Sequence, residues 1–411
     1  MARDPDAQPS DGSSSRGTRR RPVACTSHSL CNALGVDTAQ VIERLYRGES
    51  GLRAPSRAFP VETVCGEIPG PLPPLPRGLA AYDSRQARLA LALVEPMRGA
   101  IEAAVRRWGA GRVAIVLGTS TGGLAETEAA HRALLAGSGL PASYSLERTH
   151  ALSAAGDLVA GLLGLEGLRF VVSTACSSSA KALASGHRLI DAGLADAVLA
   201  GGLDTLCELT VRGFHSLGIL SPRAARPFGP DRDGINVGEG GALVLLEREG
   251  TAAVHLWGAG ETADAHHMSA PHPEGDGAEQ AMRRALEAAG VTPAQIGHIN
   301  SHGTGTPFND AAEARAIARI FGRQVPVVST KGYTGHMLGA AGATEAVFTM
   351  IALARRELPV SLGSWPVDPA FAGEIDIPQE PRACGGAFAI SNSFAFGGSN
   401  IALVFGYADG R

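Results

Sequence analysis

Short apolar strands that alternate with helices restrict the fold of this chain more than any other feature. Buried-strand patterns run from Arg112 to Leu117, from Phe170 to Ser173 and from Asp196 to Gly201, with helical patterns between them. The alternation restarts near Val254 and continues to Phe405. Repeated strand–helix units predict an α/β fold of stacked layers, and the similar order in the two parts suggests a duplicated architecture.

The composition excludes several classes of function. Of the 411 residues, 45% are hydrophobic and 18% are charged, which predicts a soluble globular chain with a substantial core. The net charge of −4 argues against binding to nucleic acid or to a membrane surface through bulk charge. Six cysteines without a CxxC pair or a metal-ligand spacing favour a reduced, cytoplasmic location. We find no apolar run of the ~18 residues that a transmembrane helix needs.

The chain divides into a short tail and two halves. Residues 1–20 are rich in Ser, Asp, Arg and Gly, which predicts a disordered tail or a start placed too far upstream. No apolar segment follows the arginines at 19–21, so we expect no signal peptide. The two predicted halves cover residues 21–250 and 251–411. Within the first, an Ala/Leu-rich pattern predicts one long helix from Ser84 to Trp108.

A cysteine lies where a predicted strand turns into a helix. The stretch from Val171 to Ala182, VVSTACSSSAKA, predicts a strand, a tight turn of small residues and a helix with Cys176 near its first turn. The helix dipole there favours a thiolate and can lower a cysteine pKa from about 8.5 to roughly 3.5–7.5. A cysteine that only fills core space fits the same segment. The segment alone leaves both interpretations open.

Three polar clusters in the second half each follow a predicted strand. His302 opens HGTGTPFND, Lys331 and His336 lie in STKGYTGHMLGAAG, and residues 392–400 read NSFAFGGSN. A structural turn explains any one cluster alone. Catalytic groups of α/β sheets gather at the carboxyl ends of strands, so the combination of Cys176 with two loop histidines favours one shared active site.

The four motifs occur in the order and approximate spacing of a known family. From about Val23 to Phe405 the chain resembles the β-ketoacyl-acyl carrier protein synthases of the thiolase superfamily, most closely the synthase I/II type. The resemblance implies a thiolase-like α-β-α-β-α layered fold built from two similar halves. It also implies a decarboxylative Claisen condensation, in which an acyl-enzyme thioester and malonyl-acyl carrier protein give 3-oxoacyl-acyl carrier protein and CO2.

The resemblance assigns roles to individual residues. Cys176 would carry the acyl group, and the backbone N–H groups of Cys176 and Phe396 would form the oxyanion hole. His302 and His336 would bind the malonyl thioester carbonyl and stabilise the enolate that forms when CO2 leaves. Lys331 would form an ion pair with Glu345, for which a structural and a catalytic role both remain open.

Further residues are expected to bind or select the substrate. Thr304 and Thr306 match hydroxyls that bind the phosphopantetheine arm, and Phe214 and Ile235 are expected beside the active site.

Thr121 stands where housekeeping enzymes often have an apolar gate to the acyl pocket. Together with Ile235, it favours a specialised pathway, such as that of aryl-polyene pigments. Asp310 and Glu313 are expected to cap and orient the following helix.

The resemblance also implies partners. An acyl carrier protein would deliver the phosphopantetheine-bound substrate, and we expect neither a metal nor a cofactor of the chain's own. A homodimer is expected, and a heterodimer with a ketosynthase-like subunit is the alternative. Two other functions stay open: a non-elongating acyltransferase, and a subunit of the chain-length-factor kind. Such subunits lack the nucleophilic cysteine, which Cys176 supplies here.

Overall fold

One large mixed sheet forms the framework of the chain. The computed structural model describes residues 21–410, so the predicted tail at 1–20 lies outside the described residues. Within them, ten strands form a sheet in the order β10-β9-β13-β14-β8-β1-β7-β6-β4-β5. The first half contributes β1 (Val23–Asn32), β4 (Val113–Gly118), β5 (Arg169–Val172), β6 (Ala197–Asp204) and β7 (Gly240–Glu247). The second contributes β8 (His255–Ala263), β9 (Ile296–Asn300), β10 (Val327–Val328), β13 (Phe388–Ala395) and β14 (Ser399–Gly406).

The two halves of the sheet repeat one topology. Counted outward from the centre, the first half runs β1-β7-β6-β4-β5 and the second runs β8-β14-β13-β9-β10. Each half therefore uses its first, fifth, fourth, second and third strand in that order. The outer three strands of each half are parallel and the inner two pair antiparallel. This correspondence confirms the predicted architecture of two similar halves.

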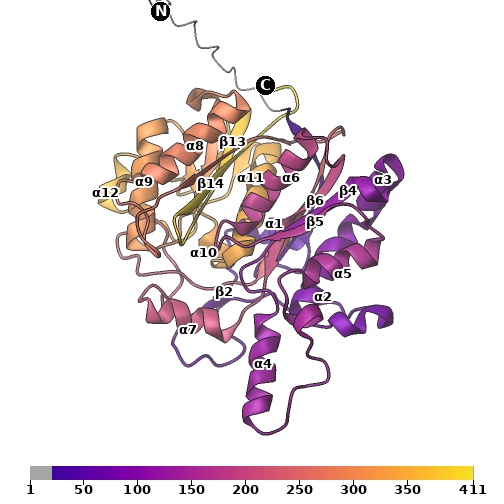
Figure 1. Cartoon of the computed structure of the whole chain (residues 1–411). Coiled ribbons are helices and arrows are strands. Elements are labelled where there is room, and N and C mark those ends of the chain that lie inside the picture. The colour runs from indigo at the N-terminus through magenta and orange to yellow at the C-terminus, as the bar shows by residue number, and fades with distance from the viewer. Residues whose placement is uncertain (1–20, 411) are drawn as a thin grey trace, which may run out of the picture.

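The two halves of the sheet and the helices on both sides of each half form five layers (Figure 1). The central helices α6 (Ser178–Asp191) and α11 (Ala341–Arg355) share one apolar core with strands of both halves. The outer layer on the first half contains α2 (Arg85–Val94), α3 (Arg98–Trp108) and α5 (Ala154–Leu163). The outer layer on the second contains α8 (Asp276–Ala289) and α9 (Pro307–Phe321). The layers confirm the predicted α-β-α-β-α order.

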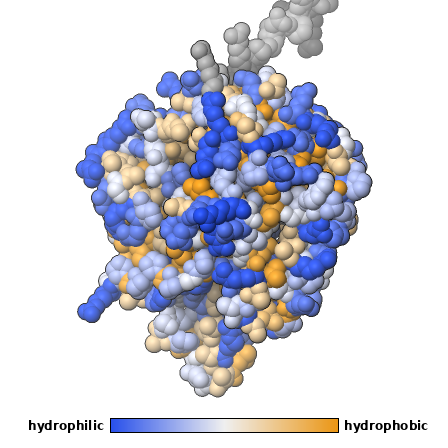
Figure 2. Space-filling view, turned by 180° about the vertical axis from the view of Figure 1, so that it is seen from behind, coloured by the Kyte–Doolittle hydropathy of each residue, from blue (hydrophilic) through white to orange (hydrophobic). Residues whose placement is uncertain are grey.

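Smaller elements surround these layers. They are α1 (Thr38–Tyr46), β2 (Leu52–Arg53), β3 (Cys65–Gly66), α4 (Leu124–Leu135), α7 (Glu208–Ser216), α10 (Lys331–Thr334), β11 (Glu357–Leu358), α12 (Pro369–Ala372) and β12 (Arg382–Ala383). α4 projects from the body of the molecule in Figure 1. Seen from behind, the surface mixes polar and apolar side chains, as a globular fold requires (Figure 2).

The two central helices approach each other closely at their N-termini. A Cβ atom on Gly342 of α11 would lie 2.8 Å from the Cβ of Ala180 on α6 and 2.8 Å from the hydroxyl of Ser393. Contacts this short exclude a larger side chain, so glycine is required at this crossing. The crossing brings the segment before α6, which holds Cys176, next to the segment before α11, which holds His336.

Two expectations about helices need correction. The helix predicted from Ser84 to Trp108 is divided, because α2 ends at Val94 and α3 begins at Arg98, with Pro96 in the turn between them. No apolar run long enough for a transmembrane helix was found in the sequence, but the stretch Leu338–Arg355 is long and apolar enough to span a membrane. Since 89% of that window is buried inside the protein, it is the core helix of the central layer.

Candidate active site

Cys176 lies in a strained turn between β5 and α6. β5 ends at Val172, α6 begins at Ser178, and the residue before the cysteine, Ala175, has a φ of +51°. A left-handed alanine costs of order 1–3 kcal/mol and is found mainly at functional sites. The turn confirms the predicted strand–turn–helix. Cys176 is buried, with 7% of its surface exposed.

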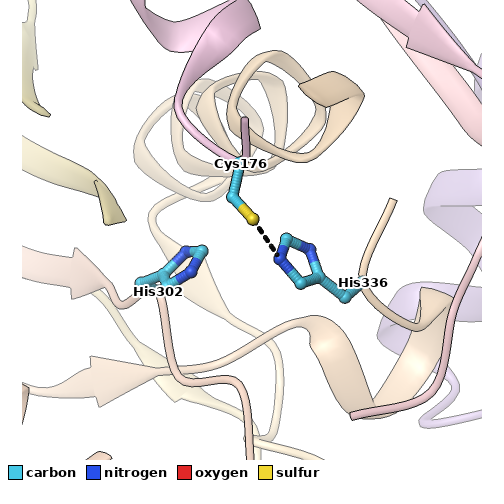
Figure 3. Close-up of side chains that lie close together, drawn as sticks. All are labelled: Cys176, His302 and His336. Atoms are coloured by element: carbon cyan, nitrogen blue, oxygen red, sulfur yellow. Dashed lines mark hydrogen bonds between the residues drawn. The ribbon is translucent and has the colours of Figure 1, made fainter. Parts of the chain in front are cut away.

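Two histidines from the second half face this cysteine (Figure 3). His336 Nε2 lies 3.0 Å from Cys176 Sγ. The rings of His302 and His336 have their centroids 5.3 Å apart at an interplanar angle of 82°. One ligating atom from each of the three residues lies within 4.8 Å of the others. The structure thus brings together the three residues that the sequence motifs single out.

The protonation of the site differs from the expectation. Burial raises the pKa of the Cys176 thiol to about 11, although the Lys331 charge and the backbone N–H of Phe396 lower it. Desolvation therefore keeps the resting sulfur a thiol, whereas the helix start alone favours a thiolate. Burial also holds the pKa values of His302 and His336 well below 6.5, so both rings are neutral at neutral pH. A neutral His336 next to a neutral thiol can accept the thiol proton.

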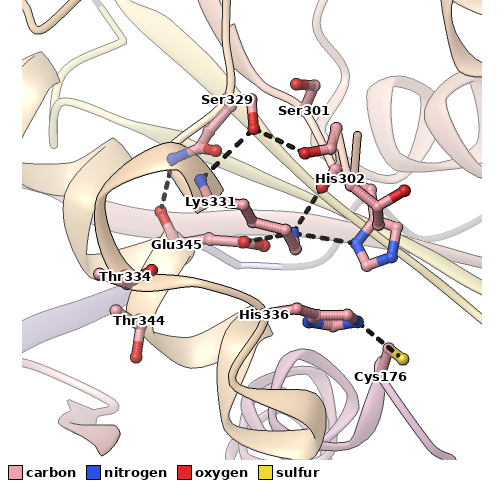
Figure 4. A network of polar contacts seen from close by, with 12 residues as sticks. Cys176, Ser301, His302, Ser329, Lys331, Thr334, His336, Thr344 and Glu345 are labelled. Carbon is pink, nitrogen blue, oxygen red and sulfur yellow. Dashed lines mark hydrogen bonds and ion pairs between the residues drawn. The ribbon is translucent and has the colours of Figure 1, made fainter. Parts of the chain in front are cut away.

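Lys331 and Glu345 form the expected ion pair behind the histidines (Figure 4). Both side chains are buried, and the ammonium group also donates to the backbone carbonyl of His302. Lys331 Nζ lies 3.3 Å from His302 Nδ1. Because a lysine ammonium can only donate, Nδ1 must accept and the ring proton of His302 must reside on Nε2. Burial raises the pKa of Glu345 to about 7, against the opposing effect of Lys331.

The ring of His336 is less constrained. Among the described residues, its Nδ1 has no hydrogen-bond partner, so either ring nitrogen can carry the proton. His336 Nε2 can therefore accept a proton in one step and donate a hydrogen bond in another.

Two carboxylates of α9 hold the loop that carries His302. Glu313 accepts from the backbone N–H groups of residues 302 and 303, both at 2.8 Å. Asp310 accepts from those of residues 304 and 305, at 3.0 and 3.1 Å. The expected role changes accordingly, because both side chains fix the preceding loop instead of capping their own helix.

A cavity opens over the three central residues. It contains most of the residues predicted for the site: Cys176, Phe214, Ile235, His302, Thr304, Thr306, His336 and Phe396. Lys331 and Glu345 do not line it. Thr121 does not line it either, contrary to its predicted role as a gate, because its backbone N–H and hydroxyl donate to Asp204 at 2.9 and 2.8 Å.

The turn between β13 and β14 lies next to the nucleophile turn. The backbone N–H of Phe396 faces the sulfur of Cys176. Asp264 fixes this turn, accepting from the side chain of Asn400 at 2.7 Å and donating its N–H to the carbonyl of Gly398 at 2.9 Å. The sequence gives no sign of Asp264, which lies in a polar segment after β8.

The cysteines at 25 and 31 lie elsewhere. Both are buried in β1, and burial raises their pKa values to about 12. They fill the core. Cys384 is also buried, with its sulfur 3.1 Å from His298 Nδ1, and does not line the cavity.

The geometry defines a class of protein. A buried thiol next to a neutral imidazole can form a thioester, and a second imidazole with its proton on Nε2 can stabilise an oxyanion in the same cavity. These are the parts of a condensing acyltransferase.

Family comparisons agree with that class. The family model of the β-ketoacyl synthase N-terminal domain matches residues 75–252, and that of the C-terminal domain matches residues 253–364. The chain belongs to the β-ketoacyl synthase family. It condenses an acyl-enzyme thioester with malonyl-acyl carrier protein, in fatty-acid or polyketide chain elongation.

Individual relatives cover most of the chain. The 3-oxoacyl-[acyl-carrier-protein] synthase 2 of Vibrio harveyi is 37% identical over 316 residues, which are 72% of this chain and 75% of the relative. A ketosynthase from Xenorhabdus doucetiae, solved in complex with its chain length factor, is 38% identical with a TM-score of 0.90, and covers 94% and 98% of the two chains. The ishigamide ketosynthase/chain length factor structure is 27% identical with a TM-score of 0.85, covering 94% and 99%.

Proposed function

We propose that Cys176 is the acyl-carrying nucleophile and that His302 and His336 stabilise the enolate. The observation that carries this assignment is the 3.0 Å contact between Cys176 Sγ and His336 Nε2, with His302 facing the same point. The contact joins a residue of the first half to residues of the second.

In the first half-reaction, the sulfur of Cys176 attacks the thioester carbonyl of an acyl-carrier protein. His336 Nε2 takes the thiol proton and returns it to the departing phosphopantetheine sulfur, so the charges balance. The N–H groups of Cys176 and Phe396 donate to the oxyanion formed in between. The raised pKa of Cys176 makes this proton transfer necessary, because the resting sulfur is a thiol.

In the second half-reaction, the malonyl thioester oxygen lies between His302 and His336. The proton on His302 Nε2 points at this oxygen because Lys331 occupies Nδ1. CO2 leaves, and the remaining electron pair forms an enolate that attacks the acyl-Cys176 carbonyl. The bond to sulfur breaks, the product leaves as a 3-oxoacyl thioester, and the expelled Cys176 thiolate takes a proton from water. The thioester and two hydrogen-bond donors suffice as an electron sink, so we propose no cofactor and no metal.

An acyl carrier protein is the proposed source of both substrates. Thr304 and Thr306 line the cavity, and their hydroxyls are 2.9 Å apart. Two adjacent hydroxyls can bond the amides of a phosphopantetheine arm. We further propose a reduced, cytoplasmic location, since the cysteines of the described residues are all unpaired thiols.

We propose that the chain is the catalytic subunit of a heterodimer with a chain-length-factor-like partner of the same fold. The 38% identical ketosynthase was solved with such a partner. In this chain the outer strand β5 exposes 40% of Phe170, and the projecting helix α4 exposes 52% of Leu134 and 74% of Leu135. A homodimer is the alternative, and size-exclusion chromatography with light scattering, with and without the co-expressed partner, distinguishes the two. This pairing, together with Ile235 in the lining of the cavity, supports a specialised pathway.

The assignment is tested by measuring the two half-reactions separately. Wild type gains the acyl mass from acyl-carrier protein, and C176A gains none. H302A still gains it, but releases CO2 from malonyl-carrier protein about 10²–10³-fold more slowly, the usual cost of losing one oxyanion donor. Cys384→Ala, which removes a buried cysteine outside the cavity, leaves both steps intact. Acylation that persists in C176A would overturn the nucleophile.

A further inference from the structure

A buried carboxylate at the end of β6 has no role in the mechanism above. Asp204 has 0% of its surface exposed. It accepts from the hydroxyl of Thr119 at 2.5 Å, from the N–H of Ser120 at 3.0 Å, and from the N–H and hydroxyl of Thr121 at 2.9 and 2.8 Å. A buried carboxylate is costly unless donors satisfy it. All of these donors belong to the loop that follows β4.

That loop holds the turn of the nucleophile. The hydroxyl of Ser120 donates to the carbonyl of Ala175 at 3.1 Å, the residue with a φ of +51° directly before Cys176. The hydroxyl of Ser178 donates to the same carbonyl at 2.6 Å. Strained backbone persists only where its surroundings fix it. One of the two hydroxyls that fix Ala175 is therefore itself positioned by Asp204.

The same loop is confined from the side of the second half. A Cβ atom on Gly339 would lie 2.7 Å from the N of Ser120 and 2.8 Å from Oδ2 of Asp204. Gly339 lies three residues after His336, so the segment following the histidine packs directly against the carboxylate. Gly339 therefore packs against the loop on the side that faces the second half.

We infer that Asp204 is a positioning residue for acyl transfer, acting through Ser120 and Ala175 on the orientation of Cys176. The inference rests on the proposed function of Cys176 as the nucleophile. The backbone N–H of Cys176 belongs to the same peptide unit as the carbonyl of Ala175. A displacement of this turn therefore misplaces both the N–H and the sulfur of Cys176, the two groups that act on the acyl thioester. The loop of His302 is held separately by Asp310 and Glu313, and the backbone of His336 is held by hydrogen bonds with Asn236 and Gly238. Decarboxylation should therefore depend less on Asp204.

The test compares three variants. Asp204→Asn keeps the shape of the side chain but presents an amide to several donors. Ser120→Ala leaves the carboxylate network in place and removes only the bond to Ala175. Glu247→Gln is the control, since Glu247 is a buried carboxylate on β7 whose partners, Thr26 and Trp108, lie outside the cavity. Rapid-quench mass spectrometry gives the acylation rate, and CO2 release from malonyl-carrier protein gives the decarboxylation rate.

We expect D204N and S120A to slow acylation at least about tenfold, because a misplacement of about 1 Å can cost 10²-fold. CO2 release should stay within about twofold, and E247Q should match wild type. Equal losses in both half-reactions would overturn the inference in favour of a structural role, and wild-type acylation in both variants would also overturn it.

Alkylation of Cys176 by iodoacetamide provides a readout that needs no carrier protein. The negative charge of Asp204 raises the pKa of Cys176. The D204N substitution removes this charge and should therefore shift the pH profile of alkylation to lower pH. The S120A substitution keeps the charge and should change the alkylation rate without that shift. This comparison tests Asp204 even if the wild type accepts no acyl group, a result that would contradict the proposed function instead. Identical profiles in all variants would overturn the inference.

Discussion

Lys331 and Glu345 act on the site through the tautomer of His302 and do not line the cavity. The two side chains are each 2% exposed, and the ammonium group is bonded to the carboxylate, to the His302 carbonyl and to its ring. A buried pair of this kind is costly to break, because the remaining buried charge loses its partner of opposite sign.

Removing one member of this pair should destabilise the fold. For Glu345→Gln we expect a loss of about 3–5 kcal/mol of unfolding free energy in urea titrations. The control is Glu95→Gln, which breaks an exposed pair with Arg98 and should cost less than about 1 kcal/mol. Similar losses of unfolding free energy in the two variants would mean that the buried pair does not stabilise the fold more than an exposed pair does.

At the scale of residues, motifs predicted which side chains meet but not how buried each would be. Cys176, His302, His336, Thr304, Thr306, Phe214, Ile235 and Phe396 surround one cavity, as the family resemblance implied. The segment around Cys176 does not indicate its raised pKa, because burial depends on the packing of the folded chain. Thr121 was misplaced because its partner, Asp204, lies at the end of a different strand, and no local pattern reveals that pairing.

At the scale of elements, glycines set how closely α6 can approach the sheet. Gly118, the last residue of β4, would place a Cβ atom 2.3 Å from the N of Ser179 in the first turn of α6. The helix start beside Cys176 can occupy its place only because no side chain is present there. The sequence predicted the strand–helix order well, since burial patterns are local, but Pro96 divides a helix whose apolar pattern is continuous.

Gly118→Ala should therefore displace the nucleophile turn. We expect slower acylation of Cys176 together with a loss of about 1–3 kcal/mol of stability, the usual cost of overpacking. Gly161→Ala is the matched control on α5, where an added Cβ meets nothing within 4 Å and alanine should gain about 0.5–1 kcal/mol. Unchanged acylation in G118A would show that the close approach is not needed.

At the scale of the whole molecule, burial of neutral histidines links stability to pH. Burial lowers the pKa of His298 from 6.5 to about 3, and those of His302 and His336 are also lowered. Because the folded pKa lies below the unfolded one, each histidine contributes stability that is present above about pH 6.5 and is lost as pH falls.

His298→Gln isolates this effect outside the cavity. The advantage of wild type over H298Q in unfolding free energy should shrink by about 1.4 kcal/mol per pH unit below about pH 6.5. Urea titrations between neutral pH and the onset of acid unfolding measure it. An advantage that stays constant with pH would show that burial does not lower the pKa of His298 in the fold.

The duplicated topology explains why the site lies where it does. In each half, a parallel strand ends next to the N-terminus of a central helix. The crossing of α6 and α11 brings together the loops that hold Cys176 and His336. The sequence indicated the duplication through its repeated strand–helix order. It could not indicate the crossing, which depends on contacts between residues more than 150 positions apart, such as Ala180 and Gly342.

The central claim is that Cys176 carries the acyl group through condensation. Peptide mapping by mass spectrometry after incubation with acyl-carrier protein, followed by isotope-labelled malonyl-carrier protein, tests it most directly. The account predicts an acyl group on the peptide containing Cys176, which disappears as a labelled 3-oxoacyl product two carbons longer forms. An acyl group on another residue, or loss of the acyl group to water without a longer product, would contradict it.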